Sequence, residues 1–281
     1  MSTLSTYAWL AQLRERFGLG AADTADDTRL LRKLRTASAA IDRYTGRRFM
    51  PWSEALAVDY HSATRLPLPR DLLDLTALTN GDGSAFALSD VKLVGYGPIH
   101  TLAVDPGKVT FAYSTIPLRA LTVTGVWGFH ERYSLAWRAS GDSLVSINGT
   151  ATPNTITVAN AAASDPAGEA PRFQAGQLLR SGSEYLNVLA VDTATNVLKV
   201  GRAAHGTTVS AAVSDALSIW IPPIDISEAC LLIAAWLIRR EDAGEAEQVT
   251  EKSVGGVGVG SGLPAQALAL LDPYRRMSGA A

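Results

Sequence analysis

Residues 27–49 read DTRLLRKLRTASAAIDRYTGRRF, and this stretch decides the architecture of the N-terminal part of the chain. Its apolar residues recur at spacings of four, three, four and three positions: Leu30, Leu34, Ala37, Ile41 and Tyr44. This spacing places them on one face of an α-helix, in a heptad-like seam suited to packing against another helix. Asp26 or Asp27 can cap its start, and Gly46 can end it. The sequence therefore predicts a helix that needs a helical partner.

A shorter apolar stripe precedes that helix. Tyr7, Leu10, Leu13 and Phe17 are three or four positions apart, which predicts a first helix that ends at Gly18 or Gly20. Residues 1–50 are thus expected to form an N-terminal helical part.

The C-terminal part contains a second strong helical signal, because residues 223–240 read PIDISEACLLIAAWLIRR. Asp225 and Glu228 have the spacing of a capping box, so Asp225 is the predicted N-cap. The segment that follows, with Trp236 near its end, is apolar on nearly all sides. A helix without a polar face is buried all round, either by its own chain or by a neighbouring subunit. Cys230 is expected to be a small buried hydrophobe within it.

An acidic stretch at 241–251 and the segment SVGGVGVGSG at 253–262 follow this helix. The glycine-rich segment cannot hold regular structure without a partner. A phosphate-binding loop is the alternative, but no strand precedes it and no Gly-Lys-Ser/Thr closes it. Pro264 is expected at the first position of a last short helix that contains Leu268 and Leu271.

The middle of the chain, from about 55 to 222, has short apolar stretches separated by Gly, Pro, Asn and Asp. This pattern predicts strands at 56–60, 91–94, 99–104, 109–113, 121–127, 144–147, 155–158, 177–180, 185–191, 197–200 and 217–221. Pro67 and Pro69 flank Leu68, and we expect this extended piece to lie outside any central strand.

The predicted fold class is α+β, with helices at both ends and a large, mostly β middle. A seam near 140–142 divides that middle, and the part after it is expected to be an inserted small barrel or sandwich. The predicted organisation is therefore a helical part at 1–50, a β-rich region at 51–139, an inserted small β domain at 140–222, and a C-terminal helix, glycine-rich loop and tail at 223–281.

Composition and charge narrow the functional classes. The chain has 281 residues, of which 47% are hydrophobic and 19% charged, so it can bury a core and is not globally disordered. The formal net charge of −2 argues against a generally basic nucleic-acid binder. Residues 1–50 are net positive and residues 223–281 net negative, which suits contact between the two ends, within a chain or between neighbouring copies. Two separate solvated helical faces are the alternative, and the favoured one. A single cysteine excludes an intramolecular disulfide and a cysteine-based zinc site. We expect neither a signal peptide nor a membrane span.

Motifs that would carry catalysis are missing from the sequence. It has no G-x-S-x-G, no H-E-x-x-H and no Walker A motif. His130-Glu131 lacks the second histidine of a zinc protease. Arg43, Arg47 and Arg48 gather at the end of the 27–45 helix, where the helix dipole favours cations; contact with phosphate is the alternative, without an aromatic platform beside it. We therefore predict no catalytic, cofactor-binding or metal-binding residues.

Segment 27–49 resembles the N-terminal signature of tailed-bacteriophage head–tail connector (adaptor, head-completion) proteins: a helix with Ala-Ser, then Ile-Asp, then Thr-Gly-Arg and an aromatic residue. Segment 223–240 also looks similar, with its acidic cap, Ala-Ala-Trp-Leu and Arg-Arg. Residues 66–73, 123–128 and 202–208 are similar in kind to larger phage adaptors. Compact members of the family lack most of 51–222.

The resemblance implies a structural, non-enzymatic component of the virion, located at the head–tail interface and assembled in the cytoplasm of a bacterial host. Members form a ring, typically of twelve copies, beneath the portal protein. The ring presents a platform for a tail-side stopper or tail-completion protein, and DNA passes through its channel as cargo without sequence recognition. No cofactor and no membrane partner is implied.

Carried onto this chain, the resemblance assigns two sets of interaction residues. The helical adaptor core and the contacts between copies would use Leu30, Leu34, Ile41, Tyr44 and Trp236. The tail that docks on the portal would use Gly255, Gly256, Gly258, Gly260, Leu268, Leu271, Tyr274 and Arg275.

Two alternatives remain at this stage. One is another virion component, such as a tail-completion protein or a glycan- or receptor-binding protein that uses the β insert. Residues 140–222 contain only Phe173, Tyr185 and Trp220 as aromatic residues, too few for a sugar-stacking platform. The other is an enzyme that uses dispersed Asp and Glu residues. Only the presence of carboxylates in the sequence supports it.

Overall fold

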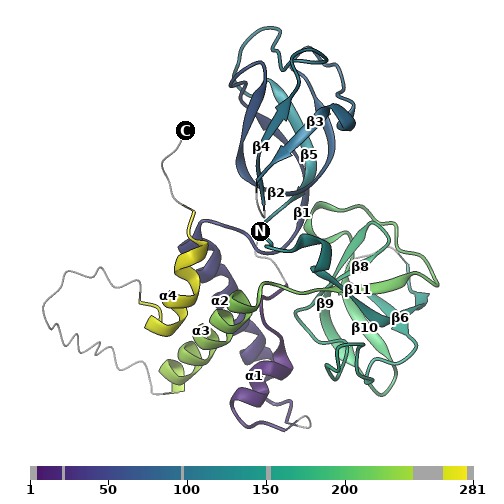
Figure 1. Ribbon diagram of the computed structural model, residues 1–281. Helices are drawn as coiled ribbons and strands as arrows, with labels where there is room; N and C mark the ends of the chain where they lie inside the picture. Colours follow the sequence, from purple (N-terminus) through teal and green to yellow (C-terminus); the bar gives the residue numbers. More distant parts are fainter. Residues whose placement is uncertain (1–4, 21–22, 96–97, 150–152, 243–261, 277–281) are drawn as a thin grey trace, which may run out of the picture.

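The computed structural model describes residues 5–20, 23–95, 98–149, 153–242 and 262–276 (Figure 1). This part of the chain contains helices, a five-stranded sheet and a closed six-stranded barrel. The predicted α+β class is confirmed. In Figure 1 the sheet extends away from the helices at the top, and the barrel lies beside them.

The helices are α1 (Leu10–Arg16), α2 (Asp27–Thr45), α3 (Ile224–Asp242) and α4 (Ala265–Leu271). Short 3₁₀ turns occur at Leu88–Asp90, Tyr133–Leu135, Ala204–Gly206 and Asp272–Tyr274. The predicted stop of α2 is confirmed: Gly46 has a φ of 65°, the left-handed conformation that glycine adopts without steric cost, and its N–H donates to the Asp42 carbonyl at 3.0 Å.

The predicted N-cap of α3 is wrong. The helix begins at Ile224, so Asp225 lies within its first turn. The carbonyl of Pro223 accepts the N–H groups of both Ile226 and Ser227 at 3.0 Å. This is possible because a proline lacks an N–H but keeps its carbonyl as an acceptor, and the Asp225 side chain is left available for a tertiary contact.

Helices α2 and α3 pack against each other through the seam predicted from the sequence. Leu30, Leu34, Ala37 and Ile41 are buried in one cluster with the inner face of α3, and Tyr44 is half-buried. The expected burial of α3 on all sides is not observed within this chain, because Trp236 is half-buried and Ile224 is 83% exposed.

Opposite charges meet between the two ends of the chain, so the favoured interpretation of two separate solvated faces is wrong for these residues. Arg16 pairs with Glu228 at 2.8 Å, Arg29 with Asp242, and Lys33 with Glu241. These pairs are partly exposed, so each stabilises the packing only weakly. The buried apolar residues therefore account for most of the packing between the helices.

The sheet contains β1 (Trp52–Val58), β2 (Arg65–Thr79), β3 (Val91–Val94), β4 (Ile99–Val104) and β5 (Leu121–Trp127), in the order β1-β5-β2-β4-β3. All its strand pairs are antiparallel, and β1 runs along β5 from the pair Trp52–Trp127 to the pair Val58–Leu121. Alternate residues of β5, such as Leu121 and Val123, enter the sheet's own apolar cluster.

The expectation that the Pro67–Pro69 piece lies outside any central strand is wrong, because it belongs to β2, which has neighbours on both sides. The reason is a register shift. Residues 65–67 pair only with β4, whereas pairing with β5 begins at Leu72. Pro67 thus pairs with Thr101 of β4 only, and the side of this stretch toward β5 is unpaired, so the prolines occupy an edge-like part of the strand.

The predicted strand at 109–113 is also wrong. Within it only Tyr113 makes an isolated bridge, to Gly81. The side chain of Asn80 takes the place of a neighbouring strand: its amide nitrogen donates to the Thr110 carbonyl at 3.2 Å, and its amide oxygen accepts the Ala112 N–H at 2.9 Å. An asparagine side chain can satisfy backbone groups in this way and so permit an irregular segment.

The barrel consists of β6 (Trp137–Ile147), β7 (Asn154–Val158), β8 (Leu178–Ser181), β9 (Glu184–Asp192), β10 (Val197–Gly201) and β11 (Ala216–Trp220). Its closed order is β10-β7-β6-β11-β8-β9. Small and medium aliphatic side chains fill its interior, including Leu144, Ile156, Leu186, Leu198 and Ile219. Closure leaves no free edge strand in it. The division of the chain into domains at 50, 139 and 222 stays a prediction.

The helical cluster joins both β units through a shared core. Phe49 and Met50, between α2 and β1, belong to that core together with Tyr185 and Trp220 of the barrel. The indole N–H of Trp220 donates to the Phe49 carbonyl at 3.0 Å. The start of the chain runs along the same junction, where Thr6 donates its N–H to the Gly176 carbonyl at 2.9 Å.

Candidate functional site

The residues assigned to a portal-docking tail fall into two groups. Gly255, Gly256, Gly258 and Gly260 lie outside the described residues. Within α4 and the turn after it, Leu271 and Tyr274 are buried, Leu268 is half-buried and Arg275 is exposed. Their role in docking stays a prediction.

Tyr274 attaches the C-terminal segment to its own chain. Its hydroxyl donates to Glu131 at 2.5 Å and lies 3.2 Å from a carboxylate oxygen of Asp225. Its ring packs edge-to-face against Phe49 and Phe129. Burial raises the pKa of the Tyr274 hydroxyl, and both carboxylates act in the same direction, so it stays neutral.

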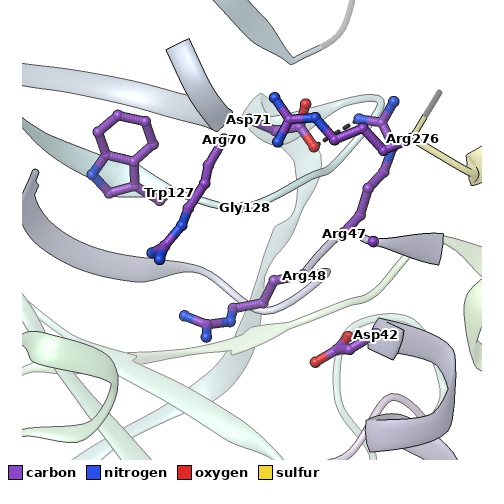
Figure 2. A pocket seen from close by; sticks show the side chains of 9 residues that line it. Asp42, Arg47, Arg48, Arg70, Asp71, Trp127, Gly128 and Arg276 are labelled. Carbon is purple, nitrogen blue, oxygen red and sulfur yellow. Dashed lines mark hydrogen bonds and ion pairs between the residues drawn. The ribbon is translucent and has the colours of Figure 1, made fainter. Parts of the chain in front are cut away.

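A pocket of about 320 Å³ lies where α2, the sheet and the C-terminal segment meet (Figure 2). Its lining is rich in arginine: Asp42, Gly46, Arg47, Arg48, Arg70, Asp71, Trp127, Gly128 and Arg276. These residues are far apart in the sequence.

Backbone hydrogen bonds hold the walls of this pocket together. The Arg48 carbonyl accepts the Phe129 N–H at 2.7 Å, and the Asp71 carbonyl accepts the Gly128 N–H at 2.9 Å. Arg276 donates its own N–H to the Thr45 carbonyl at 2.8 Å. The backbone is tightly packed at Gly128, where an added Cβ would come within 2.9 Å of the Met50 carbonyl oxygen. The arginines thus extend from a fixed frame.

Two of the four arginines are held by partners inside the chain. Arg47 donates to Asp71 at 2.6 Å and to the Tyr274 carbonyl at 2.8 Å, and it lies over the Phe129 ring. Arg276 donates to the carbonyls of Pro69 and Leu68 at 2.5 and 3.3 Å. Carbonyl groups orient a guanidinium but do not neutralise it, so the positive charge of Arg276 remains in the pocket.

The other two arginines are held less firmly. Arg70 is exposed and reaches Glu54 at 3.1 Å. Arg48 stacks on the Trp52 ring, with its guanidinium carbon 4.6 Å from the ring centroid, and has no hydrogen bond or ion pair to its guanidinium within the described residues. In Figure 2 the Arg48 and Arg70 side chains extend to the same side of the pocket, away from the Arg47–Asp71 pair.

Asp42 is the second carboxylate of the pocket, and its charge is only weakly maintained. Burial raises its pKa to about 6, against the opposing effects of the hydrogen bond from the Tyr7 hydroxyl and of Arg48. With Asp71 engaged by Arg47, the guanidinium groups that line the pocket outnumber its carboxylates. The pocket is therefore electropositive, and more so below pH 6, where Asp42 takes up a proton.

The chain's buried titratable groups have structural partners. The His205 ring donates from Nδ1 to the Pro51 carbonyl at 3.0 Å and lies against Trp52, and burial lowers its pKa to about 4. His130 contacts the Ile221 carbonyl at 3.0 Å. Burial raises the pKa of the Cys230 thiol to about 12, which makes it unreactive, as its assignment as a core residue predicted.

The described ranges contain neither a metal-binding cluster nor a membrane-spanning helix. No group of three or more His, Cys, Asp or Glu side chains there is arranged to hold a metal ion. Among the same residues, no helix combines the length and the apolarity needed to cross a bilayer.

The aromatic residues of 140–222 bear on the glycan-binding alternative. Phe173, Tyr185 and Trp220 are all buried, at 0%, 5% and 1% exposure. None of the three can therefore stack on a sugar from solvent.

Sequence reasoning identified only part of the arginine pocket. Arg47 and Arg48 were noted as a helix-end cluster, but Arg70 and Arg276 were not connected with them. Arg70 lies in the proline-containing stretch of β2, and Arg276 follows the last helix. Nothing in the local sequence indicates that these two meet the end of α2, because the contact depends on how the sheet and α4 pack.

Comparisons with known proteins do not assign the chain to a family. No family model and no curated protein matches the sequence. Among solved structures, a chain of "Neck of empty GTA particle computed with C6 symmetry" aligns with 96% of this chain and 90% of its own, at 16% identity and a TM-score of 0.39. A TM-score of this size assigns neither fold nor function.

Proposed function

We propose that the protein is a structural head–tail connector of a tailed phage: a ring beneath the portal that joins the capsid to the tail and surrounds the DNA channel. The observation that carries this proposal is the contact between α2 and α3. These helices contain the two segments that resemble the connector family, 27–49 and 223–240. Although about 180 residues separate the segments in the sequence, they pack as one unit.

The distribution of apolar residues over α3 supports assembly. One side of the helix buries Ile226, Cys230 and Ile233 against α2, while Trp236 is half-buried and Ile224 is 83% exposed. Apolar surface left over on an otherwise apolar helix is typical of a contact with another chain. In the proposed ring this surface meets a sibling copy, alongside the core formed by Leu30, Leu34, Ile41 and Tyr44.

The proposed partners follow from the same role. The ring binds the portal protein on one side and a tail-side stopper or tail-completion protein on the other. The near-neutral net charge suits a conduit through which DNA slides as cargo, because strong phosphate neutralisation would retain it. Portal docking would use Leu268 and Arg275, together with the glycines of 253–262. Leu271 and Tyr274 would support this segment from the core.

A non-enzymatic role agrees with the polar groups of the described residues. Three strongly perturbed groups, Glu184, His205 and Tyr274, are each hydrogen-bonded to partners within the chain. Perturbed titratable groups that mark catalytic sites face a cavity where a substrate can reach them. Asp42 does line the arginine pocket with a raised pKa, but its carboxylate already accepts the Tyr7 hydroxyl.

The decisive experiment is electron microscopy and native mass spectrometry of the purified chain, alone and mixed with its portal protein. We expect closed rings in the mixture, seated on one face of the portal. A chain that stays monomeric under both conditions, or that is missing from mature particles, overturns the proposal.

A surface variant sharpens this test. Leu135 and Ile224 are 68% and 83% exposed and lie close to the backbone contact between Ile221 and Ala136. The double variant Leu135→Ser/Ile224→Ser is expected to fold normally but to form fewer rings, whereas Val209→Ser, on the barrel and 43% exposed, is the matched control. Normal rings from the double variant would exclude this surface as the contact between copies.

A further inference from the structure

We propose that the arginine pocket at the end of α2 is a binding site for a phosphate group. The site consists of Arg48 and Arg70, whose side chains extend to the same side of the pocket (Figure 2). Arg276 and the Arg47–Asp71 pair line the other side. This inference is independent of ring formation, because all lining residues come from one chain.

The first argument is charge. Arg47 and Asp71 form an ion pair, so they leave little net charge. Arg276 is bonded to neutral carbonyls, and Arg70 reaches Glu54 at 3.1 Å on the exposed surface. Arg48 stacks on Trp52 and has the Asp42 carboxylate as an electrostatic partner. Like charges brought together by a folded chain repel each other unless an anion lies between them. The pocket therefore provides more positive charge than its own carboxylates neutralise.

The second argument is geometry. A guanidinium donates paired N–H groups to oxyanions, and several guanidinium groups that approach from different directions match a tetrahedral phosphate better than a planar carboxylate. The arginines here come from three parts of the fold: the α2–β1 connection, β2 and the segment after α4. The pocket volume of about 320 Å³ leaves room for a phosphate group and part of what it is attached to.

The third argument is rigidity. The backbone of each wall is hydrogen-bonded to a neighbouring wall, at Arg48, Asp71 and Arg276. The positions from which the side chains extend are thus set before any ligand arrives, so little conformational entropy of the backbone is lost on binding.

The test is isothermal titration calorimetry of the full chain with inorganic phosphate at low salt and near neutral pH. The variants are Arg48→Gln and Arg70→Gln, because neither side chain is part of a buried ion pair. Circular dichroism melting shows that each variant is folded. Arg132→Gln is the matched control, since Arg132 is exposed and lies outside the pocket.

We expect saturable binding of one phosphate per chain, weakened on the order of tenfold by each pocket variant and unchanged by the control. Arg48→Lys keeps the charge but loses the paired donors, so it is expected to restore only part of the affinity. Absence of saturable phosphate binding, or equal binding by wild type and both pocket variants, overturns the proposal. Tighter binding of acetate or glutamate than of phosphate overturns the assigned ligand class.

A competition arm identifies the source of the phosphate. If a short DNA duplex displaces inorganic phosphate from wild type, and the pocket variants lose affinity for both, the group belongs to a nucleic-acid backbone. If the duplex does not compete, the ligand is free phosphate or a small phosphorylated molecule. Both results support the site and differ only in its natural occupant.

Discussion

Two arginine sites in this molecule use the same side chain in opposite ways. In the barrel, Arg202 and Glu184 form a paired contact of two 2.7 Å hydrogen bonds, and both side chains are almost fully buried. Glu184 also accepts the N–H groups of Ala203, Ser210 and Ala211 at 2.8 Å. In the pocket at the end of α2, the Arg48 guanidinium stacks on an aromatic ring and has no hydrogen bond or ion pair within the described residues, and Arg70 is exposed.

The difference separates a structural site from a site that can take a ligand. At Glu184 the arginine and the backbone N–H groups together lower the carboxyl pKa to about 2, although burial opposes this shift. No acceptor capacity is left for an outside group, so the pair stabilises the loops between β9, β10 and β11. In the α2 pocket the donors outnumber the acceptors, so an anion can still be bound there.

The largest effect on stability is expected from breaking the buried ion pair between Glu184 and Arg202. Glu184→Gln leaves the Arg202 guanidinium buried without its counter-charge, and we expect a loss of unfolding free energy of about 3–5 kcal/mol. Denaturant unfolding followed by circular dichroism measures it. Glu184→Gln/Arg202→Met removes both partners and is expected to recover part of the loss. A loss of unfolding free energy below about 1 kcal/mol in the single variant would mean that Glu184 and Arg202 behave like an exposed ion pair and not a buried one.

An intermediate effect is expected from pH at His205, the buried residue that links the barrel to Pro51. Its pKa is about 4 in the folded chain, below the value of 6.5 for an exposed histidine. The unfolded chain therefore binds more protons between these values, so stability falls as the pH drops from 6.5 to 4, by about 3 kcal/mol for this group.

The measurement compares wild type with His205→Gln by denaturant unfolding across that pH range. The comparison is needed because Asp42, with a folded pKa of about 6, contributes with the opposite sign between pH 6 and its lower unfolded value. Both proteins contain Asp42, so the difference between them isolates His205. Parallel stability curves would contradict the prediction.

The smallest effect on stability is expected from substituting Arg48 in the arginine pocket at the end of α2. Arg48→Gln removes one cation–π contact and no hydrogen bond or ion pair of the described residues, so unfolding free energy should change by less than about 1 kcal/mol. The same denaturant measurement gives the value. A loss as large as that of Glu184→Gln would show that Arg48 is structural and would remove the contrast between the two sites.

The helical ends were largely predictable because their signals are local and periodic. The spacing of apolar residues alone predicts the seam from Leu30 to Ile41, and Gly46 alone predicts where α2 ends. The same holds for strands such as β3 and β5, whose apolar runs are bounded by turn residues. Where a long-range contact replaced the local signal, the predictions were wrong: Asn80 satisfies the backbone at 110–112, and a register shift admits Pro67 and Pro69 into β2.

The candidate site was predictable only at Arg47 and Arg48. Their local context, the end of a helix, already accounts for their charge, so nothing in it indicated a pocket. Arg70 and Arg276 join them because β2 passes the end of α2 and because Tyr274 holds the C-terminal segment against Phe49 and Phe129.

The sequence by itself determined the α+β class, the helix seam, most of the strands and the burial of Cys230, because hydrophobic spacing, turn residues and caps act over a few positions. Only the tertiary structure decided the closed barrel, the pairing of Arg202 with Glu184, and the meeting of four arginines around one pocket. These features depend on side chains that come from distant parts of the chain, and their energies arise only when packing removes water and brings the charges within a few ångströms of one another.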